Sequence, residues 1–265
     1  MRRVALEQGT PEWLAWRQTR RMASETPCVL GISPWAPRTH AALALRKRSG
    51  SGIPDNKAMR WGRQHEQDGR AAAEAMLGEP LEPCCVEDVG GSYAASLDGI
   101  TFRGDVITEV KCPYSGAGSD YYRMVAECGT PPASAFAQVQ HQLMVSGASR
   151  CLFVVWTPAT VVHCWVEPDP EQWAVIRSAW DAFWPLMSPD ACLDDYIERD
   201  DDAWRDVAIA WRRAKADLDV ATEAEKHQRD RLVALADGNT VDGAGLRVIA
   251  TTRNGTIYYQ VREAK

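Results

Sequence analysis

The sequence lacks the features that would direct the protein into a membrane or an export pathway. It has no apolar run long enough to span a bilayer. The two arginines at the N-terminus are followed by no apolar stretch, so we expect no secretory signal. Internal repeats and low-complexity tracts are also missing. What remains is a 265-residue chain with 45% hydrophobic residues, enough for one large globular domain or for a domain with an appendage.

The chain also lacks an excess of basic residues. Its 30 Lys and Arg residues against 36 Asp and Glu residues give a formal net charge of −6. This balance argues against a protein that is basic over its whole surface, such as a histone-like DNA binder. It does not exclude DNA binding, because a local arginine cluster or bound metal ions can reverse the sign of the potential inside a groove.

Cysteine pairs with metal-binding spacing are missing as well. No two cysteines form a CxxC pair, so a zinc site is weakly supported, and an iron–sulfur cluster would need grouped thiolates. Scattered cysteines are typical of small core residues in a reducing compartment, and this is the interpretation we adopt. The eight are Cys28, Cys84, Cys85, Cys112, Cys128, Cys151, Cys164 and Cys192.

The apolar pattern up to residue 190 predicts helices, a strand meander, a helix, two strands and a helix. The predicted helices cover residues 11–17, 59–76, 133–145 and 173–187, and Ser24 is a candidate helix N-cap. The predicted strands cover residues 81–89, 99–102, 106–110, 151–156 and 161–166. This order is typical of an α/β or α+β domain with a mixed sheet.

The composition changes after Pro189, so we predict a first domain over residues 1–190 and an extension over residues 191–265. The pattern of the extension predicts one long helix, ended near Asp237-Gly238-Asn239, and a β-hairpin over 245–252 and 256–261 around Asn254-Gly255. An apolar stripe on the helix fits packing against the first domain, or an interface with a partner helix or another subunit. Its members are Trp204, Val207, Trp211, Ala214, Leu218 and Ala221.

The run VITEVK, residues 106–111, places Glu109 and Lys111 on the same face of a predicted strand. A second acid, Asp98, sits at the end of an adjoining strand. Two carboxylates brought together repel each other unless they are neutralised, and Mg²⁺ or Mn²⁺ bound to hard oxygen ligands, such as these carboxylates and the Val110 carbonyl, would do so. Lys111 would then face the attacking water or the phosphate charge. From these residues alone, an ordinary ion pair fits as well.

Five stretches occur in an order that resembles the phage lambda exonuclease and YqaJ-type viral recombinase family, within the PD-(D/E)XK nuclease superfamily. They are GTPEWLAWRQTRRMASE, MRWGRQHE, AASLDGI, ITEVKCP and AFAQVQHQLMVSGA, and the resemblance covers roughly residues 9–166. One departure is that Leu97, rather than Pro, precedes Asp98. The resemblance implies a restriction-endonuclease-like core, with a central mixed sheet flanked by helices, over residues 1–190. It assigns no function to residues 191–265.

The resemblance also implies a set of metal and catalytic residues. Asp98 and Glu109 would hold the metal ions, with Asp98 bridging two Mg²⁺ ions for which Mn²⁺ could substitute. Lys111 would position or polarise the water nucleophile. Glu66 would be a further acid near the metals, although an exposed helix Glu is the alternative. Gln138 would hydrogen-bond near the nucleophile or the phosphate.

Two neighbours of Gln138 on the same predicted helix are less well placed. Gln140 lies two residues further along, and residues two apart on a helix do not share a face. We expect His141 to be structural rather than a ligand.

A second implied site binds the terminal 5′-phosphate of DNA. Arg17 and Ser24 would form it, because Arg can grip a phosphate bidentately and a hydroxyl at a helix start is well placed beside it. Ser96 would join them, and Trp13 would stack on a base. The alternatives are a solvated arginine, a plain N-cap and a core tryptophan.

The expected activity is a Mg²⁺-dependent 5′→3′ exonuclease that degrades one strand of linear double-stranded DNA to 5′-mononucleotides, preferring 5′-phosphorylated ends. The resemblance implies a ring-shaped homotrimer and a single-strand annealing partner, encoded by a phage or prophage and acting in the bacterial cytoplasm, with no membrane involved. One alternative is a structure-specific or restriction-like endonuclease on the same fold. The other is an inactive DNA-binding recombination scaffold, against which the intact Asp98, Glu109 and Lys111 argue.

Overall fold

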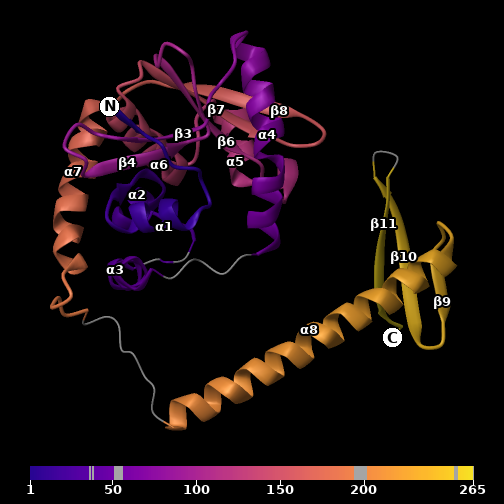
Figure 1. The fold of residues 1–265 in the computed structure, drawn as a ribbon. Coiled ribbons are helices and arrows are strands. Elements are labelled where there is room, and N and C mark those ends of the chain that lie inside the picture. Colours follow the sequence, from indigo (N-terminus) through magenta and orange to yellow (C-terminus); the bar gives the residue numbers. More distant parts are fainter. Residues whose placement is uncertain (36, 38, 51–55, 194–201, 254–255, 265) are drawn as a thin grey trace. The chain divides into compact units, whose positions relative to one another are not determined.

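The computed structural model describes the chain except for residues 36, 38, 51–55, 194–201, 254–255 and 265. The chain divides into two compact units, Met1–Ile197 and Glu198–Lys265 (Figure 1). None of the helices in the described ranges combines the length and apolarity needed to cross a membrane. The assignment of residues 1–190 to a nuclease domain stays a prediction.

The first unit alternates helices with short strands. Its helical segments are α1 (Pro11–Gln18), η1 (Ala23–Glu25), α2 (Thr26–Val29), α3 (His40–Ser49), α4 (Lys57–Leu77), η2 (Gly116–Gly118), α5 (Asp120–Cys128), α6 (Ala133–Ser146), α7 (Pro170–Phe183) and η3 (Trp184–Met187). Its strands are β1 (Arg2–Val4), β2 (Arg21–Met22), β3 (Cys84–Glu87), β4 (Tyr93–Leu97), β5 (Gly99–Ile100), β6 (Val106–Lys111), β7 (Arg150–Trp156) and β8 (Val161–Val166).

The strands form two four-stranded sheets in the orders β1-β3-β4-β2 and β5-β6-β7-β8. In the second sheet β6 and β7 are parallel, and the chain passes between them through α5 and α6. Parallel strands need such a crossover, since a tight hairpin can join only antiparallel neighbours. The mixed α/β fold expected from the sequence is therefore confirmed.

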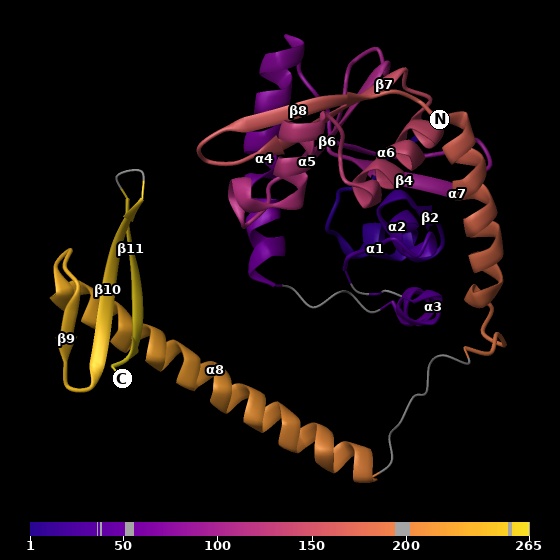
Figure 2. The ribbon, with the colours of Figure 1, turned by 180° about the vertical axis from the view of Figure 1, so that it is seen from behind.

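Strand β7 is buried on both faces, which explains its continuous apolar run. Phe153 and Val155 share a core with Val139 and Leu143 of α6. Leu152 and Val154 point the other way, into a core shared with α4. Helices α4 and α6 thus cover opposite faces of the β6–β7 pair (Figures 1 and 2).

Helix α4 approaches the sheet at Gly69. A Cβ built on Gly69 would overlap Val110 Cγ1 and lie 3.3 Å from Trp156 Cβ. Only a residue without a side chain fits between the helix and these two strands, so Gly69 sets the distance between α4 and the strand that carries Glu109 and Lys111.

Several elements differ from those predicted. Strand β4, helix α3 and helix α5 were not anticipated, and the strand predicted over 81–89 extends only from Cys84 to Glu87. The prediction of Ser24 as a helix N-cap is wrong. Ser24 lies inside the 3₁₀ turn η1, whose cap is Met22, and α2 is capped by Glu25. The helical turn begins two residues earlier than the Ser24-Glu25 pattern predicts.

The cysteines are all free thiols. Five are buried, in line with the expectation of small core residues, and Cys84 is half-buried. Cys128 and Cys192 are exposed, so the expectation is wrong for these two.

The C-terminal unit consists of α8 (Asp202–Ala236) and the sheet β11-β10-β9, formed by β9 (Val241–Gly243), β10 (Leu246–Arg253) and β11 (Thr256–Glu263). The helix ends where Asp237 and Gly238 adopt positive φ angles of 46° and 82°. Trp211 and Leu218 of the predicted stripe are 65% and 58% exposed. The turn predicted at Asn254-Gly255 lies outside the described residues.

We predict that Gly69→Ala lowers the free energy of unfolding by about 1–3 kcal/mol, because the added methyl group overpacks the contact with Val110. Denaturant unfolding measures the change. Gly62→Ala on the same helix is the control, since the nearest atom to its added Cβ is the Cys112 carbonyl oxygen at 4.0 Å. Gly62→Ala should be neutral or stabilising, as alanine is the better helix former. Equal effects of the two changes would contradict the packing argument.

Candidate active site

Asp98 lies where the chain passes from one sheet to the other, between β4 and β5. Its side-chain Oδ2 accepts a hydrogen bond of 2.8 Å from the Val110 backbone N–H. Its backbone carbonyl accepts one of 3.1 Å from Arg70 of α4. In a strand the N–H and C=O of one residue point to the same edge, so the Val110 carbonyl is directed to the side on which Asp98 lies.

Glu109 is a buried carboxylate, 2% exposed, on the face of β6 that α6 covers. Lys111 Nζ and Gln138 Nε2 donate to its Oε1 at 2.5 and 2.7 Å. Gln142 Nε2 donates to its Oε2 at 2.5 Å. The predicted trio of Glu109, Lys111 and Gln138 is therefore in direct contact, and both carboxylate oxygens of Glu109 are bonded.

Gln142 was missed by the sequence analysis. It lies four residues after Gln138, one helical turn further along the same face of α6. That spacing was a usable signal, since two glutamines on one helix face over a strand carrying a buried acid are natural donors to it.

Gln140 and His141 of this helix point away from Glu109 and bind other partners. Gln140 donates to the Glu167 carbonyl at 2.7 Å and accepts from the Trp173 indole N–H at 3.0 Å, at the start of α7. His141 is buried, its Nδ1 is 2.6 Å from the Thr26 hydroxyl, and burial lowers its pKa to about 3. It is therefore neutral and lies in the core.

Glu66 belongs to the same acidic group. It projects from α4, with its Oε1 3.6 Å from Arg70 Nη1, and its side chain is 36% exposed. Burial, offset in part by Arg70 and reinforced by Glu109, raises the pKa of Glu66. The structure thus directs three carboxylates, those of Glu66, Asp98 and Glu109, toward one region.

Electrostatic repulsion is strong in this group. Burial, then the charges of Glu109 and Glu66, raise the pKa of Asp98 well above its ordinary value. Burial alone would lower the pKa of Lys111, but Glu109, Tyr121 and Asp98 raise it, so the lysine is charged. Lys111 and Arg70 supply two positive charges beside the three carboxylates, so one negative charge is left in excess when all three carboxylates are ionised.

The donor chemistry fits a hard divalent cation, since the available ligands are carboxylate oxygens and the Val110 carbonyl oxygen. Bound charge of this kind would offset the burial, and the repulsion from Glu109 and Glu66, that together raise the pKa of Asp98. Within the described part of the chain, no group of three or more His, Cys, Asp or Glu residues has the geometry of a formed metal site. Glu109 instead holds Lys111, Gln138 and Gln142.

The four residues predicted for a phosphate site form one chain of contacts. Arg17 Nη2 donates to Ser24 Oγ at 2.9 Å, and the Arg17 guanidinium lies 4.5 Å from the centre of the Trp13 ring. The Trp13 indole N–H donates to Ser96 Oγ at 2.9 Å. Burial lowers the pKa of Arg17 below its ordinary value, although a guanidinium stays protonated in proteins.

Lys47 of α3 stabilises this cluster through three contacts. Its Nζ donates to the carbonyls of Arg17 and Arg20 at 2.8 and 2.9 Å and to Glu25 Oε2 at 2.6 Å. Lys47 is 4% exposed, so the end of α1 is held by a buried ammonium. No sequence pattern pointed to Lys47, because its partners lie more than twenty residues away.

The two clusters are connected through β4. Ser96 lies in this strand, and Asp98 follows its last residue, Leu97. Two residues of extended chain span about 7 Å. Ser96 of the phosphate cluster and Asp98 of the acidic group are therefore separated by a short step along the backbone.

One family model and several solved structures match the chain. A model of the YqaJ-like viral recombinase domain matches residues 12–149. The crystal structure of an alkaline exonuclease (LHK-Exo) from Laribacter hongkongensis aligns with a TM-score of 0.57 and 24% identity, covering 67% of this chain and 92% of that one. Its complex with dAMP gives the same values. A phage-related exonuclease from Haemophilus somnus 129PT aligns with a TM-score of 0.51 and 12% identity, covering 63% and 93%. No curated protein sequence gave a match.

We predict that Asp98→Asn raises thermal stability in chelating buffer at about pH 8. The folded protein binds the Asp98 proton more tightly than the unfolded chain, so ionisation destabilises the fold as the pH rises above about 4. Asparagine keeps the acceptor for the Val110 N–H but does not ionise. The gain should vanish near pH 3, where wild-type Asp98 is protonated in both states.

Asp105→Asn is the matched control, for which the expected change in melting temperature has the opposite sign. The Thr101 hydroxyl, 2.7 Å from Asp105 Oδ1, holds the pKa of Asp105 below its usual value. The ionised form of Asp105 therefore stabilises the fold above that pKa, and Asp105→Asn should lower the melting temperature at about pH 8. A lower melting temperature for Asp98→Asn as well would contradict the repulsion described at the acidic group.

Proposed function

The chain belongs to the YqaJ-like viral recombinase family and has the fold of the alkaline exonucleases; from this premise we propose that it is a Mg²⁺-dependent 5′→3′ exonuclease. It would degrade one strand of linear double-stranded DNA to 5′-mononucleotides and leave 3′ single-stranded overhangs. The observation that carries the proposal is the contact of Glu109 with Lys111 and Gln138 beside Asp98. The dAMP complex of the Laribacter enzyme supports it, since dAMP is a nucleoside monophosphate.

Asp98, Glu109 and the Val110 carbonyl would hold the metal, which supplies Lewis-acid polarisation of the phosphodiester and lowers the pKa of a bound water. Lys111 carries a firm positive charge at the point where negative charge develops during cleavage. The Gln138 amide accepts a hydrogen bond from Lys111 and donates one to Glu109. This position would allow it to orient a water or a phosphate oxygen.

The direction of digestion requires a second recognition element, because every phosphodiester presents the same chemistry to a metal site. A terminal 5′-phosphate differs in its extra negative charge and additional free oxygen. Arg17 with Ser24 offers a guanidinium and a hydroxyl already 2.9 Å apart. Burial of Arg17 strengthens its attraction for a phosphate, since fewer waters compete.

Three finer parts of the proposal derive from the family resemblance. These are the closed homotrimer ring, which would keep an acidic protein on DNA, the single-strand annealing partner, and action in the cytoplasm of a phage-carrying bacterium. A cyclic ring repeats one heterologous interface. Light scattering at working concentration measures the assembly, and a monomeric mass would rule out the ring.

The decisive experiment compares linear duplex DNA labelled at the 5′ or the 3′ end, in the presence of Mg²⁺. We expect early release of labelled mononucleotide from the 5′ end and late release from the 3′ end. A closed circular duplex should stay intact. Cutting of the circle would favour the endonuclease, and no cleavage of any substrate would favour an inactive DNA-binding scaffold.

We predict that Lys111→Ala slows cleavage by roughly 100-fold or more while Mg²⁺ affinity is retained, because the lysine acts where charge develops. Glu109→Gln should lose both cleavage and Mg²⁺ affinity, the latter measured by calorimetric titration. Lys215→Ala, which removes an equal charge from an ion pair on α8, is the control and should leave both unchanged. Near-normal turnover by Lys111→Ala would refute the site assignment.

We predict that Arg17→Ala loses about 10- to 100-fold in initial rate on 5′-phosphorylated ends, the effect of one charge-assisted contact. The loss on 5′-hydroxyl ends should be much smaller. Arg177→Ala, an exposed arginine on α7, is the matched control and should change neither rate. If Arg17→Ala keeps the wild-type preference for the phosphorylated end, the phosphate pocket lies elsewhere.

A further inference from the structure

The C-terminal sheet has one face covered and one face open. Helix α8 contacts β10 and β11, and Ala236 and Val248 are buried there. Residues directly opposite each other across an antiparallel pair share a face, so Val248 and its partner Val261 lie on the covered side. The alternate positions, beginning with Arg247 opposite Arg262, form the other face.

This other face, here called the outer face, is basic in an acidic protein. Arg247, Arg262 and Arg253 lie on it, and Asp242 of β9 is the acid opposite Arg247. Asp242 accepts two hydrogen bonds from Arg247, at 2.5 and 2.6 Å. One acid and three arginines leave a local excess of positive charge, against −6 for the whole chain. The charge suits a polyanion.

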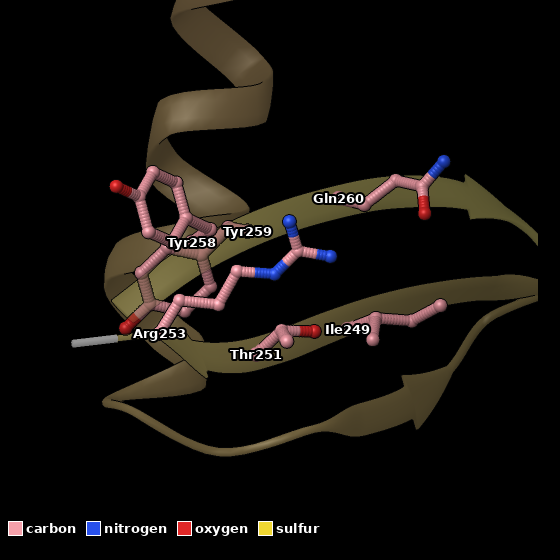
Figure 3. Close-up of a pocket in the computed structure, with 6 residues that line it drawn as sticks. All are labelled: Ile249, Thr251, Arg253, Tyr258, Tyr259 and Gln260. Atoms are coloured by element: carbon pink, nitrogen blue, oxygen red, sulfur yellow. The ribbon is translucent and has the colours of Figure 1, made fainter. Parts of the chain in front are cut away.

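A hollow of about 430 Å³ opens on the same side, toward the hairpin end of the two strands. It is lined by Ile249, Thr251, Arg253, Tyr258, Tyr259 and Gln260. Figure 3 shows the Arg253 side chain reaching across the strands between Thr251 and Gln260, with the tyrosine rings beside its stem. The Tyr258 side chain is 58% exposed. The hollow thus offers an aromatic face, a guanidinium, an amide and a hydroxyl together.

These groups match an unpaired nucleotide better than a closed duplex. An exposed aromatic ring binds a base by stacking, which requires a base that is not already stacked in a helix, while arginines beside it hold the phosphates. The amide of Gln260 and the hydroxyl of Thr251 can hydrogen-bond to base edges. A two-stranded ribbon can also enter a major groove, but the hollow and its tyrosine would then have no role.

We infer that the outer face of the C-terminal sheet is a binding site for single-stranded DNA, separate from the nuclease site. Tyr258 stacks on a base in the hollow, and Arg253 and Arg262 contact the backbone phosphates. The inference concerns binding alone, and it stands whether or not the nuclease site is active.

Fluorescence anisotropy of a labelled single-stranded 20-mer, with the full-length chain in chelating buffer, tests the site. A gel of the oligonucleotide after the measurement shows that it is intact. Tyr258→Ala should weaken binding roughly 5- to 100-fold, the range for loss of one stacked base. The Arg253→Ala and Arg262→Ala double variant should weaken binding and also flatten the salt dependence, by about 0.7 in the log–log slope for each phosphate that the protein no longer neutralises.

Two further variants keep the test independent of folding. Gln260→Glu retains size and adds a negative charge to the hollow, so it should weaken binding without loss of structure. Arg213→Ala removes one charge from exposed α8 and should bind within about twofold of wild type. Unchanged affinity in the Tyr258 and arginine variants would overturn the site. An equal loss for a blunt duplex 20-mer would overturn the assignment to single strands. Nuclease rates on duplex ends report on the proposed function separately.

Discussion

The burial of the Glu109 carboxylate is the constraint around which the first unit is organised. Removing a carboxylate from water carries a penalty of several kcal/mol unless donors replace the water. Three donors do so, from Lys111, Gln138 and Gln142. Two of these come from one face of α6, so the rotation of α6 about its own axis is set by β6. Gln140 and His141 of α6 then bind different neighbours: Gln140 binds the start of α7, and His141 binds the Thr26 hydroxyl.

The sequence predicted an element correctly where its pattern of polar and apolar residues had one structural cause. The alternation in VITEVK put Glu109 and Lys111 on the same face, and the run CLFVV gave β7, since a strand buried on both faces carries no polar alternation. Strand β4 was missed because its centre, Ala94-Ala95-Ser96, lacks the branched and aromatic residues typical of strands. Its conformation is imposed by its neighbours β3 and β2.

Contacts between distant segments could not be predicted from residue types. The Trp13–Ser96 hydrogen bond joins residues 83 positions apart, and Lys47 reaches α1 from a helix that the pattern did not reveal. The family resemblance named Arg17, Ser24, Ser96 and Trp13 together for a phosphate site. The structure shows how they are joined, since Ser24 contacts Arg17, Arg17 contacts Trp13, and Trp13 contacts Ser96.

Strand β4 also fixes the separation between two parts of the candidate site. Its pairing with β3 on one side and β2 on the other leaves it no freedom to lengthen or contract. Ser96 lies in this strand and Asp98 comes directly after its last residue, so the separation between the hydroxyl bound to Trp13 and the first acid of the proposed metal site is set by two backbone steps, about 7 Å when extended. In the proposed nuclease, the position of a 5′-phosphate relative to the cut would then depend in part on the length of this backbone step.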